Sequence, residues 1–489
     1  MDWIIGFAFF LVLGIIIFIM EFFRNKLNLP PEITRKSVHL ITGLFIAITP
    51  LFLKSNTPVL AIALLVIPLN YYAIQKDVLK SIHNTTRKSY GTVFYPMAFF
   101  ILVLLLWDNH KTVLIASTLV LAIADTAAAM IGVRIKKPLN YVFGEEKKSV
   151  QGSVSMFVIS TLIIFFTLHF VGRYDDLHIE TGNALLFSLV TALIATACES
   201  VSFIGSDNLT VPLGTAFSLH FLLTHPNNQA FYLGVVLALI LAIVSYRVKF
   251  LDGGGSVTMF MLGIIVFGTG GWKFSLPILS FFLLSSIISK LGKSKKQKFM
   301  DTFQKSSQRD LWQVLANGGI AGILVLIWNY FPYEIFYYMF SGAIAAANAD
   351  TWATEIGVFS KSRPRHILTF THVPIGSSGG VSLLGTFGAL IGSAVIAAVS
   401  YLFIKNIYIF VFITLAGFIG SVADSIIGGT IQVQYKCPNC SKITEKTIHC
   451  ITHKTDIVSG LEWIDNDIVN TLCTFFGAIF AGFILYFSL

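Results

Sequence analysis

Apolar runs long enough to cross a lipid bilayer recur along the whole of this 489-residue chain. A transmembrane helix needs about 20 predominantly apolar residues, and such runs extend from Trp3–Met20 to Val469–Leu489. Only 12% of the residues are charged, whereas about a quarter are charged in soluble domains. A soluble fold is therefore disfavoured. We expect an all-α polytopic membrane protein, embedded in a lipid bilayer, with roughly 14 to 16 transmembrane helices.

Basic residues in alternate loops predict how the chain is oriented. The first run lacks a small-residue cleavage site and is followed by Arg24 and Lys26, so we interpret it as a retained anchor. Loops rich in Lys and Arg stay on the cytoplasmic side. Five segments have this character: Arg24–Lys36, Lys76–Lys88, Arg134–Lys148, Lys290–Arg309 and Lys361–Arg365. The net charge of +9 thus indicates topology first and anionic ligands second. We expect a multi-pass protein of the cell membrane, and no nucleic-acid partner.

The chain contains an internal duplication. The string "ADTAAAMIG" (Ala124–Gly132) recurs as "ADTWATEIG" (Ala349–Gly357), identical at six of nine positions. Downstream of the two copies lie "GSVS" from Gly152 and "GGVS" from Gly379. An acid followed by Ser then comes 74 residues after the first Asp of each copy (199 − 125 and 424 − 350). These are Glu199-Ser200 and Asp424-Ser425.

Looser counterparts extend the repeat to both sides. Arg35 with His39 matches Arg309 with Gln313, and Asp207-Asn208 matches Asp465-Asn466. We therefore divide the chain near His225 into two homologous helical bundles, residues 1–225 and 226–489. Repeats of this kind are also found in transporters, which remain an alternative.

Ionisable residues gather where the apolar runs end, and we expect these ends, and the active sites that they form, to face the cytoplasm. Charges at such depth are costly and indicate function. Acids that hold a divalent cation, with Lys and Arg that neutralise phosphate oxygens, are typical of phosphoryl transfer. No Gly-x4-Gly-Lys-Ser/Thr motif is present, so we do not expect a P-loop to bind the nucleotide phosphates. A transporter would place polar groups nearer the membrane midplane.

In the first bundle we interpret Asp125 as a Mg²⁺ ligand and catalytic residue; the alternative is a helix-packing Asp satisfied by hydroxyl groups. The loop "GEEKKSVQGS" has the composition of a phosphate cradle, although a solvated basic loop is the simpler interpretation. Glu199 and Asp207 are further catalytic candidates. The candidates for nucleotide and phosphate contact are Arg35, Lys36, His39, Lys147, Lys148, Ser149, Gly152 and Asn208.

In the second bundle the expected Mg²⁺ ligands are Asp350, Glu355 and Asp424, of which Asp350 and Asp424 are also the catalytic candidates. The string "VPIGSSGGVS" from Val373 stands where the Lys loop stands in the first bundle, and predicts a glycine-rich phosphate cradle. The turn "LDGGGS" from Leu251 fits an anion site or a plain interhelix turn. The candidates for phosphate contact are Arg309, Asn317, Gly376, Ser377, Gly379, Gly380 and Asn466.

The five cysteines fall into two groups. Cys198 and Cys473 lie in apolar runs and are interpreted as core residues. The other three share the segment Cys437-x2-Cys440-x8-His449-Cys450-x2-His453, whose residue types suit a tetrahedral zinc site. The spacing matches no standard zinc finger, so a polar loop without metal remains an alternative. A structural disulfide is disfavoured in a reducing compartment.

Residues 1–225 resemble the family of dolichol, diacylglycerol and phytol kinases. The strings that carry this resemblance are "RKSVHLITG", "SYGTVFYP", "ADTAAAMIG", "KKSVQGS" and "ESVSFIGSDNLTVP". The resemblance implies that CTP or another nucleoside triphosphate donates its γ-phosphate to a lipid alcohol. It also implies that Asp125, Lys147, Lys148, Glu199 and Asp207 form the site.

Residues 226–489 resemble the transmembrane family that includes plant phytyl-phosphate kinases. The strings are "LDGGG", "RDLWQVLANGG", "NADTWATEIG", "GSSGGVS", "VADSIIGGTIQVQY" and "GLEWIDNDIVN". This resemblance implies that a second phosphate is added to a prenyl monophosphate.

Together these features predict a bifunctional salvage kinase. It would convert phytol, geranylgeraniol or farnesol to the monophosphate and then to the diphosphate, with Mg²⁺ and CTP or another nucleotide. A cytidylyltransferase acting on a lipid phosphate would use similar ligands, and a lipid-phosphate transporter would also fit the repeat. The oligomeric state is left open.

Overall fold

The computed structural model describes residues 1–27, 31–76, 89–143, 146–225, 228–291, 308–450 and 453–486. Most of the two basic loops expected at Lys76–Lys88 and Lys290–Arg309 lies outside the described residues. The chain divides into two compact units, Met1–Asn228 and Gln229–Leu489. This division falls close to the boundary near His225 that the duplication predicts. The kinase identities of the two units stay predictions.

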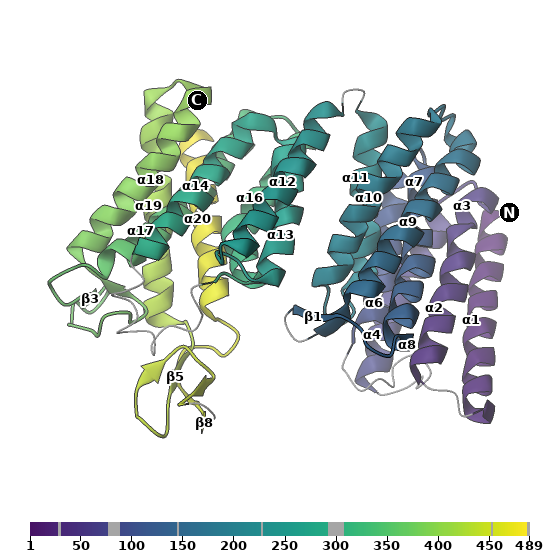
Figure 1. The fold of residues 1–489 in the computed structure, drawn as a ribbon, viewed down its shortest axis with the longest axis horizontal. Helices are drawn as coiled ribbons and strands as arrows, with labels where there is room; N and C mark the ends of the chain where they lie inside the picture. The colour runs from purple at the N-terminus through teal and green to yellow at the C-terminus, as the bar shows by residue number, and fades with distance from the viewer. Residues whose placement is uncertain are drawn as a thin grey trace. The chain divides into compact units, whose positions relative to one another are not determined.

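The expectation of an all-α polytopic membrane protein is confirmed (Figure 1). Eleven helices within the described residues are long and apolar enough to cross a membrane. Two shorter apolar helices, Gly91–Leu106 and Gly253–Thr269, add to them. The expected number of spans also counted shorter or more polar helices, such as α2 (Pro31–Ala47) and α11 (Asp207–Thr224). The short β-strands lie between helices, in the connections.

The helices of unit 1 follow the apolar runs of the sequence. In chain order its helices are α1 (Asp2–Leu27), α2 (Pro31–Ala47), α3 (Thr49–Phe52), α4 (Thr57–Gln75), α6 (Gly91–Leu106), α7 (Lys111–Leu119), η1 (Val120–Asp125), α8 (Thr126–Arg134), α9 (Val150–Phe170), η2 (Gly172–Asp175), α10 (Thr181–Val201) and α11 (Asp207–Thr224). An antiparallel hairpin, β1 (Asn140–Phe143) and β2 (Glu146–Ser149), leads into α9.

A π-helical turn interrupts the span that carries the first "ADT" motif. Helices α7 and α8 form one membrane span, Lys111–Arg134, and η1 is the π-helical segment between them. Asp125 is the last residue of that segment and is 3% exposed. Single π turns within α-helices are frequent at functional sites. The π-helical turn therefore indicates a functional role for Asp125, independently of the repeated motif.

Unit 2 is built around one buried helix. Its helices are α12 (Gln229–Arg247), α13 (Gly253–Gly263), η3 (Ile264–Thr269), α14 (Gly271–Leu291), α16 (Leu311–Tyr330), α17 (Glu334–Gly357), α18 (Leu383–Ile404), α19 (Ile407–Thr430) and α20 (Asn466–Tyr486). Helix α17 carries the second "ADT" motif and packs against α14, α16, α18, α19 and α20. Its small residues make this possible, because the run Ala343–Ala347 is fully enclosed.

Short strands of unit 2 lie in two connections. The pair β3 (Arg365–His366) and β4 (Gly380–Val381) precedes α18. Between α19 and α20 lie β5 (Gln434–Lys436), β6 (Ile443–Thr444), β7 (Ile448–His449), β8 (His453–Lys454) and β9 (Asp456–Ser459). These form a three-stranded sheet in the order β6-β5-β9 and a β7-β8 pair. Figure 1 shows them beyond the ends of α19 and α20.

The same local device begins α9 and α18. Ser149 Oγ accepts a hydrogen bond from Gly152 N at 3.1 Å, and Ser382 Oγ accepts one from Gly385 N at 3.1 Å. A Cβ atom on Gly152 would lie 3.0 Å from the carbonyl oxygen of Ala128, and one on Gly385 would lie 2.9 Å from that of Ala353. Both alanines stand three residues after the repeated Asp.

These contacts correct the repeat alignment at two places. Gly152 corresponds to Gly385 rather than to Gly379, so Lys148 corresponds to Val381. The match of Arg35 with Arg309 is also wrong. Arg309 introduces α16, which immediately precedes α17 and packs against α20, as α6 immediately precedes α7 and packs against α11. Arg35 instead lies in α2, two spans earlier.

Helices α17 and α20 approach each other closely at glycines. A Cβ atom on Gly477 would lie 2.5 Å from the carbonyl oxygen of Gly342, and one on Gly342 would overlap that of Gly477. Small residues at such crossings allow backbones to meet, which is a main source of helix association in membranes.

We predict that Gly477→Val lowers the melting temperature of the detergent-solubilised protein by roughly 5–10 °C, because overpacking costs about 1–3 kcal/mol. Gly319→Val is the matched control, since no atom lies within 4 Å of the Cβ position there. A thermal-unfolding assay measures both. Equal melting temperatures for the two variants would show that the crossing does not limit stability.

Candidate functional site

A buried ion pair links α2 to the π turn of unit 1. Lys36 Nζ lies 2.7 Å from Asp125 Oδ2, and the two side chains are 9% and 5% exposed. His39, one turn after Lys36, donates from Nε2 to the carbonyl oxygen of Leu121 at 3.1 Å and lies 3.9 Å from the same carboxylate. Three of the predicted residues thus form one cluster. Helix packing through hydroxyl groups, the alternative for Asp125, does not describe this contact.

A second ion pair joins the β1–β2 hairpin to the end of α10. Lys148 Nζ lies 2.9 Å from Glu199 Oε1 and also donates to the carbonyl oxygen of Glu199. Burial lowers the pKa of Lys148, but attraction by Glu199 and Asp207 outweighs it, so the pKa stands above its ordinary value. Lys148 is therefore a fixed cation. Lys147 is exposed, because side chains alternate along a strand, and lies apart from this pair.

The turn before α11 places Asp207 and Asn208. Gly205 adopts a φ of +84°, which brings the backbone against Gly91 at the start of α6. Asn208 is buried and donates from Nδ2 to Gly205 O at 3.2 Å. Its Oδ1 is buried and has no hydrogen-bond partner among the described residues. Asp207 acts on Lys148 and Glu199 electrostatically, so the turn belongs to the same cluster.

The structure also places the other predicted residues of unit 1. Ser149 caps α9, and Gly152 permits its close approach to α8. Arg35 lies in α2, one residue before the buried Lys36. Two residues were not predicted: Tyr141, whose hydroxyl meets Ser153 Oγ at 2.6 Å, and Glu146, which accepts from Ile204 N at 2.7 Å. Glu146 lies in the predicted loop and Tyr141 shortly before it, but only the strand register reveals which way they point.

We predict that Lys36→Met destabilises unit 1 by about 3–5 kcal/mol, because it leaves a buried carboxylate without its cation. Lys36→Met combined with Asp125→Asn should recover most of the loss. Lys273→Met is the matched control: its pair with Glu334 has the same 2.7 Å length, but Glu334 is 58% exposed, so the loss should stay below about 1 kcal/mol. Chemical or thermal unfolding in detergent measures all three, and similar losses for the two single variants would contradict the prediction.

Unit 2 holds a cavity of about 540 Å³. All ten residues predicted for the site of this unit line it, although they come from five separate stretches of chain. They are Arg309, Asn317, Asp350, Glu355, Gly376, Ser377, Gly379, Gly380, Asp424 and Asn466. The structure thus brings the whole predicted set together, while the catalytic and ligand roles of its members stay predictions.

Carboxylates dominate the charge of this cavity. Asp350 from α17 and Asp424 from α19 are in hydrogen-bond contact, and Asp424 Oδ2 is buried with no hydrogen-bond partner among the described residues. Glu355, five residues after Asp350 in α17, accepts from Ser289 Oγ at 2.8 Å. Glu445 also lines the cavity. Carboxylate oxygens at such density are the ligands that a hard divalent cation prefers.

Arg309 is the single basic residue in the described lining of the cavity. Burial lowers the pKa of its guanidinium, and the attraction of Glu355 only partly opposes this effect. Arginine nevertheless remains charged in proteins. The lining also contains no lysine at the position of Lys148, because Val381 stands there. Unit 1 therefore neutralises its acids with lysines, whereas unit 2 sets four acids against one arginine.

The glycine-rich loop forms one wall of the cavity. Gly376 and Gly379 have φ values of +87° and +73°, a conformation that favours glycine. A Cβ atom on Gly379 would overlap Gly429 of α19. The loop is tied to α19 by His366, whose Nε2 lies 3.0 Å from Gly429 O. The predicted cradle is thus a rigid loop whose backbone packs directly against a helix.

A small apolar pocket of about 50 Å³ adjoins the cavity. It shares Arg309, Gln313 and Asn317 with the larger cavity. Its other walls are aliphatic and aromatic: Leu251, Met259, Leu262, Gly263, Val266, Phe267, Ile278, Leu279, Phe281, Phe282, Val314 and Gly318. The arrangement suits a ligand with a charged head and an apolar chain.

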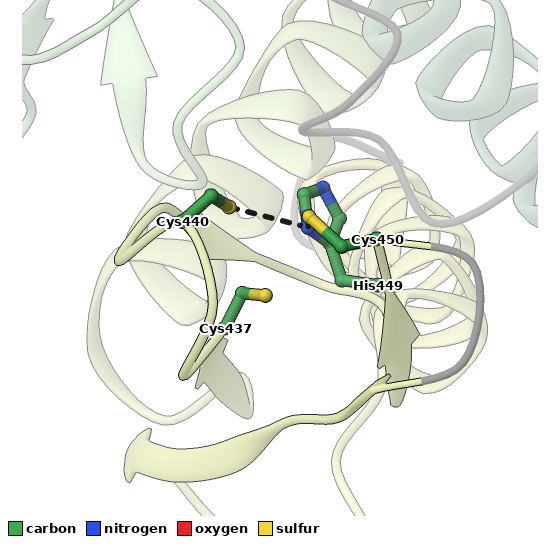
Figure 2. Close-up of side chains that lie close together, drawn as sticks. All are labelled: Cys437, Cys440, His449 and Cys450. Carbon is green, nitrogen blue, oxygen red and sulfur yellow. Dashed lines mark hydrogen bonds between the residues drawn. The ribbon is translucent and has the colours of Figure 1, made fainter.

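The cysteine-rich segment folds as a cluster. Cys437, Cys440, His449 and Cys450 have ligand atoms within 4.8 Å of one another, and Figure 2 shows their side chains pointing toward a common centre. His453 faces His449 across β7–β8, but it is exposed and outside the cluster. Glu445, in the same segment, reaches the cavity without any pattern in the sequence that would have predicted it.

One family model and several known proteins match parts of the chain. A family model described as "Integral membrane protein DUF92" matches residues 236–478. Protein PGR of Arabidopsis thaliana is 33% identical over 262 residues, which cover 48% of this chain and 89% of that protein. An uncharacterized membrane protein of Methanocaldococcus jannaschii is 32% identical over 202 residues, covering 41% and 83%.

Relatives with a named activity also match. The phytol kinase of Synechocystis sp. is 31% identical over 199 residues, which cover 39% of this chain and 80% of that protein. No solved structure matches the chain.

Proposed function

Because the chain belongs to the DUF92 family of integral membrane proteins and to the wider family of the phytol kinases, we propose that it phosphorylates a prenyl alcohol in two steps. Unit 1 transfers the γ-phosphate of CTP or another nucleoside triphosphate to phytol, geranylgeraniol or farnesol. Unit 2 then adds a second phosphate to the monophosphate. Two sites on one chain would let the lipid intermediate stay in the membrane.

The observation that carries the proposal is the convergence around the cavity of unit 2. Its volume of about 540 Å³ is in the usual range for small-molecule sites. The glycine-rich loop and the acids of α17 and α19 all line it, and the apolar pocket shares Arg309 with it. Phosphoryl transfer asks chiefly for positioning and charge neutralisation, and the cavity offers both.

The residues present fit a bound Mg²⁺. Asp350 and Asp424 offer adjacent carboxylates, and Asp424 Oδ2 is buried with no partner among the described residues. When bound to these carboxylates, Mg²⁺ would neutralise the negative charge of phosphate oxygens. With four acids and one arginine, the lining would otherwise repel a polyphosphate. Arg309 would hold the phosphate of the lipid acceptor, and the part of the lipid chain next to the phosphate would enter the apolar pocket.

In unit 1 the lysines take a larger share of the charge. Lys36 is paired with Asp125, and Lys148 is paired with Glu199. From these positions the two ammonium groups would also bind phosphate oxygens. The alcohol oxygen would attack the γ-phosphorus as the bond to the bridging oxygen breaks. Asp207 would accept the alcohol proton. Unit 2 needs no such base, because a lipid phosphate is already ionised.

The decisive experiment incubates the protein in detergent with Mg²⁺, a prenyl alcohol and each nucleoside triphosphate, and follows lipid products by mass. We expect monophosphate and diphosphate from the unmodified protein. Asp350→Asn should stop at the monophosphate. Asp125→Asn should leave the alcohol unchanged but still convert added prenyl monophosphate. Asp108→Asn and Glu334→Gln, exposed acids of the two units, should behave as the unmodified protein.

Other products would decide for other functions. A lipid that gains a nucleotide rather than a phosphate would indicate a cytidylyltransferase. Absence of any covalent product with all four nucleotides would overturn the kinase proposal and leave lipid-phosphate transport to be tested in vesicles. If Asp125→Asn and Asp350→Asn both abolished the same step, a single composite activity would replace the two-step scheme.

The two steps should also differ in their response to metal. Asp424→Asn removes one carboxylate from a site that has few cations of its own, so the half-saturating Mg²⁺ concentration of the second step should rise roughly tenfold, about 1.4 kcal/mol. The first step should keep its Mg²⁺ dependence. Initial rates over a Mg²⁺ titration, with alcohol or monophosphate as the acceptor, measure both. An unchanged titration for the second step would exclude Asp424 as a ligand.

A further inference from the structure

The segment between α19 and α20 places three thiols and one imidazole close together. Cys437 follows β5 and Cys440 lies in the turn before β6, while His449 ends β7 and Cys450 follows it. Cys440 Sγ and Cys450 Sγ lie 3.4 Å and 3.3 Å from His449 Nδ1. Figure 2 shows Cys437 completing the group from the adjoining turn.

These separations are close to those of a tetrahedral zinc site. With Zn–S near 2.3 Å and Zn–N near 2.0–2.1 Å, a regular tetrahedron has edges of roughly 3.6 Å between sulfur and nitrogen and roughly 3.8 Å between two sulfurs. Every pair of ligand atoms in the cluster lies within 4.8 Å, so a bound ion requires only small rotations of side chains. Among the described residues, no other group of three or more potential ligand atoms is gathered closely enough to surround one ion without rearrangement.

The backbone of the first turn is arranged for thiolate ligands. The amide groups of Cys440 and Asn439 hydrogen-bond the sulfur of Cys437. Cys437 is fully buried, and His449 is 9% exposed. Cys440 is followed by Ser441 with a φ of +58°, which closes the turn as Ser441 N donates to Cys437 O at 2.8 Å.

The described part of the segment buries little apolar surface of its own. The strands from Gln434 to Ser459 form two small sheets, and several of their apolar side chains face outward. Ile443, Ile448, Ile457 and Val458 are each about half exposed (49–57%). Chains shorter than about 40 residues seldom bury enough apolar surface to fold without disulfides or metals. A metal ion bound by the four clustered ligands would add the stability that so small an apolar core does not provide.

We propose that Cys437, Cys440, His449 and Cys450 bind a structural Zn²⁺ ion, and that this ion fixes Glu445 at the cavity of unit 2. Glu445 lies between the two halves of the ligand set in sequence. Its Oε1 accepts hydrogen bonds from Ser378 Oγ of the glycine-rich loop at 2.7 Å and from Gln432 Nε2 at 2.9 Å. The zinc-bound segment is thereby connected to the wall of the cavity. The second half of the proposal rests on the proposed function.

The metal site is tested without any enzyme assay. The full-length protein, purified in detergent under reducing conditions, should contain about one zinc per chain. After chelation, Co²⁺ added alone should produce the intense visible absorption of a tetrahedral, thiolate-ligated ion, and Zn²⁺ should displace it. Cys440→Ser and Cys450→Ser should weaken this signal strongly, whereas Cys198→Ala, a buried thiol of unit 1, should leave it intact.

Two results would contradict the proposed metal site. Protein that contains no zinc and gives no tetrahedral Co²⁺ spectrum, although its thiols are reduced, would exclude it. A disulfide found between any two of the cluster's cysteines in protein prepared without oxidant would indicate a redox pair instead. Should the cysteine variants fail to fold, the Co²⁺ titration of the unmodified chain still decides the question.

The link to the cavity is tested by a thermodynamic cycle. Equilibrium dialysis measures the affinity for a Mg²⁺-nucleotide in the unmodified protein and in Glu445→Gln, each with and without zinc. We expect zinc removal to weaken binding at least fivefold in the unmodified protein and to have little further effect in Glu445→Gln. Equal weakening in both would overturn the role of Glu445. If no nucleotide binds under any condition, the proposed function fails while the zinc result stands.

Discussion

A carboxylate held among apolar helices has to be neutralised, and most of the arrangement around both sites follows from this requirement. Unit 1 meets it with lysines: Lys36 reaches Asp125 from a neighbouring helix, and Lys148 reaches Glu199 from a hairpin. Unit 2 has kept the acids but not the lysine of the hairpin, since Val381 stands at that position. Its acids instead face a cavity that can admit a cation from solution. The two copies of one duplicated fold thus solve the same electrostatic problem differently.

This difference bears on how the halves could act in sequence. A site whose acids are already paired with lysines presents cations to an incoming phosphate from the start. A site rich in unneutralised negative charge takes up metal first and binds phosphate through it. An ionised lipid phosphate is a poorer partner for the second kind of site unless metal and nucleotide arrive together. That ordering suits an enzyme in which the product of one half is the acceptor of the other.

Much of this could be predicted from the sequence because the repeat supplies two independent views of one pattern. Asp125 and Asp350 share a nine-residue motif, and Glu199 and Asp424 keep the same distance from it, so all four were found. The glycine loop was found as well, from its composition. The alignment failed for Arg309, because its helix resembles α2 in local sequence yet takes the place of α6 in the packing. Glu445 was missed because its position depends on the fold of a small segment with no repeat partner. Lys147 and Lys148 could not be distinguished until the strand register placed them on opposite faces.

The π turn before Asp125 has a consequence for the history of the fold. Such a turn holds one residue more than a turn of α-helix, whereas α17 carries the same motif in unbroken α-helix. An inserted residue would normally rotate everything beyond it by about 100° around the helix axis, turning the acid away from its partners. A local bulge confines that rotation to a single turn. Membrane helices in duplicated proteins can therefore change length by one residue while the functional side chains at their ends keep their orientation. The sequences of the two halves can then diverge while the two sites keep a common geometry.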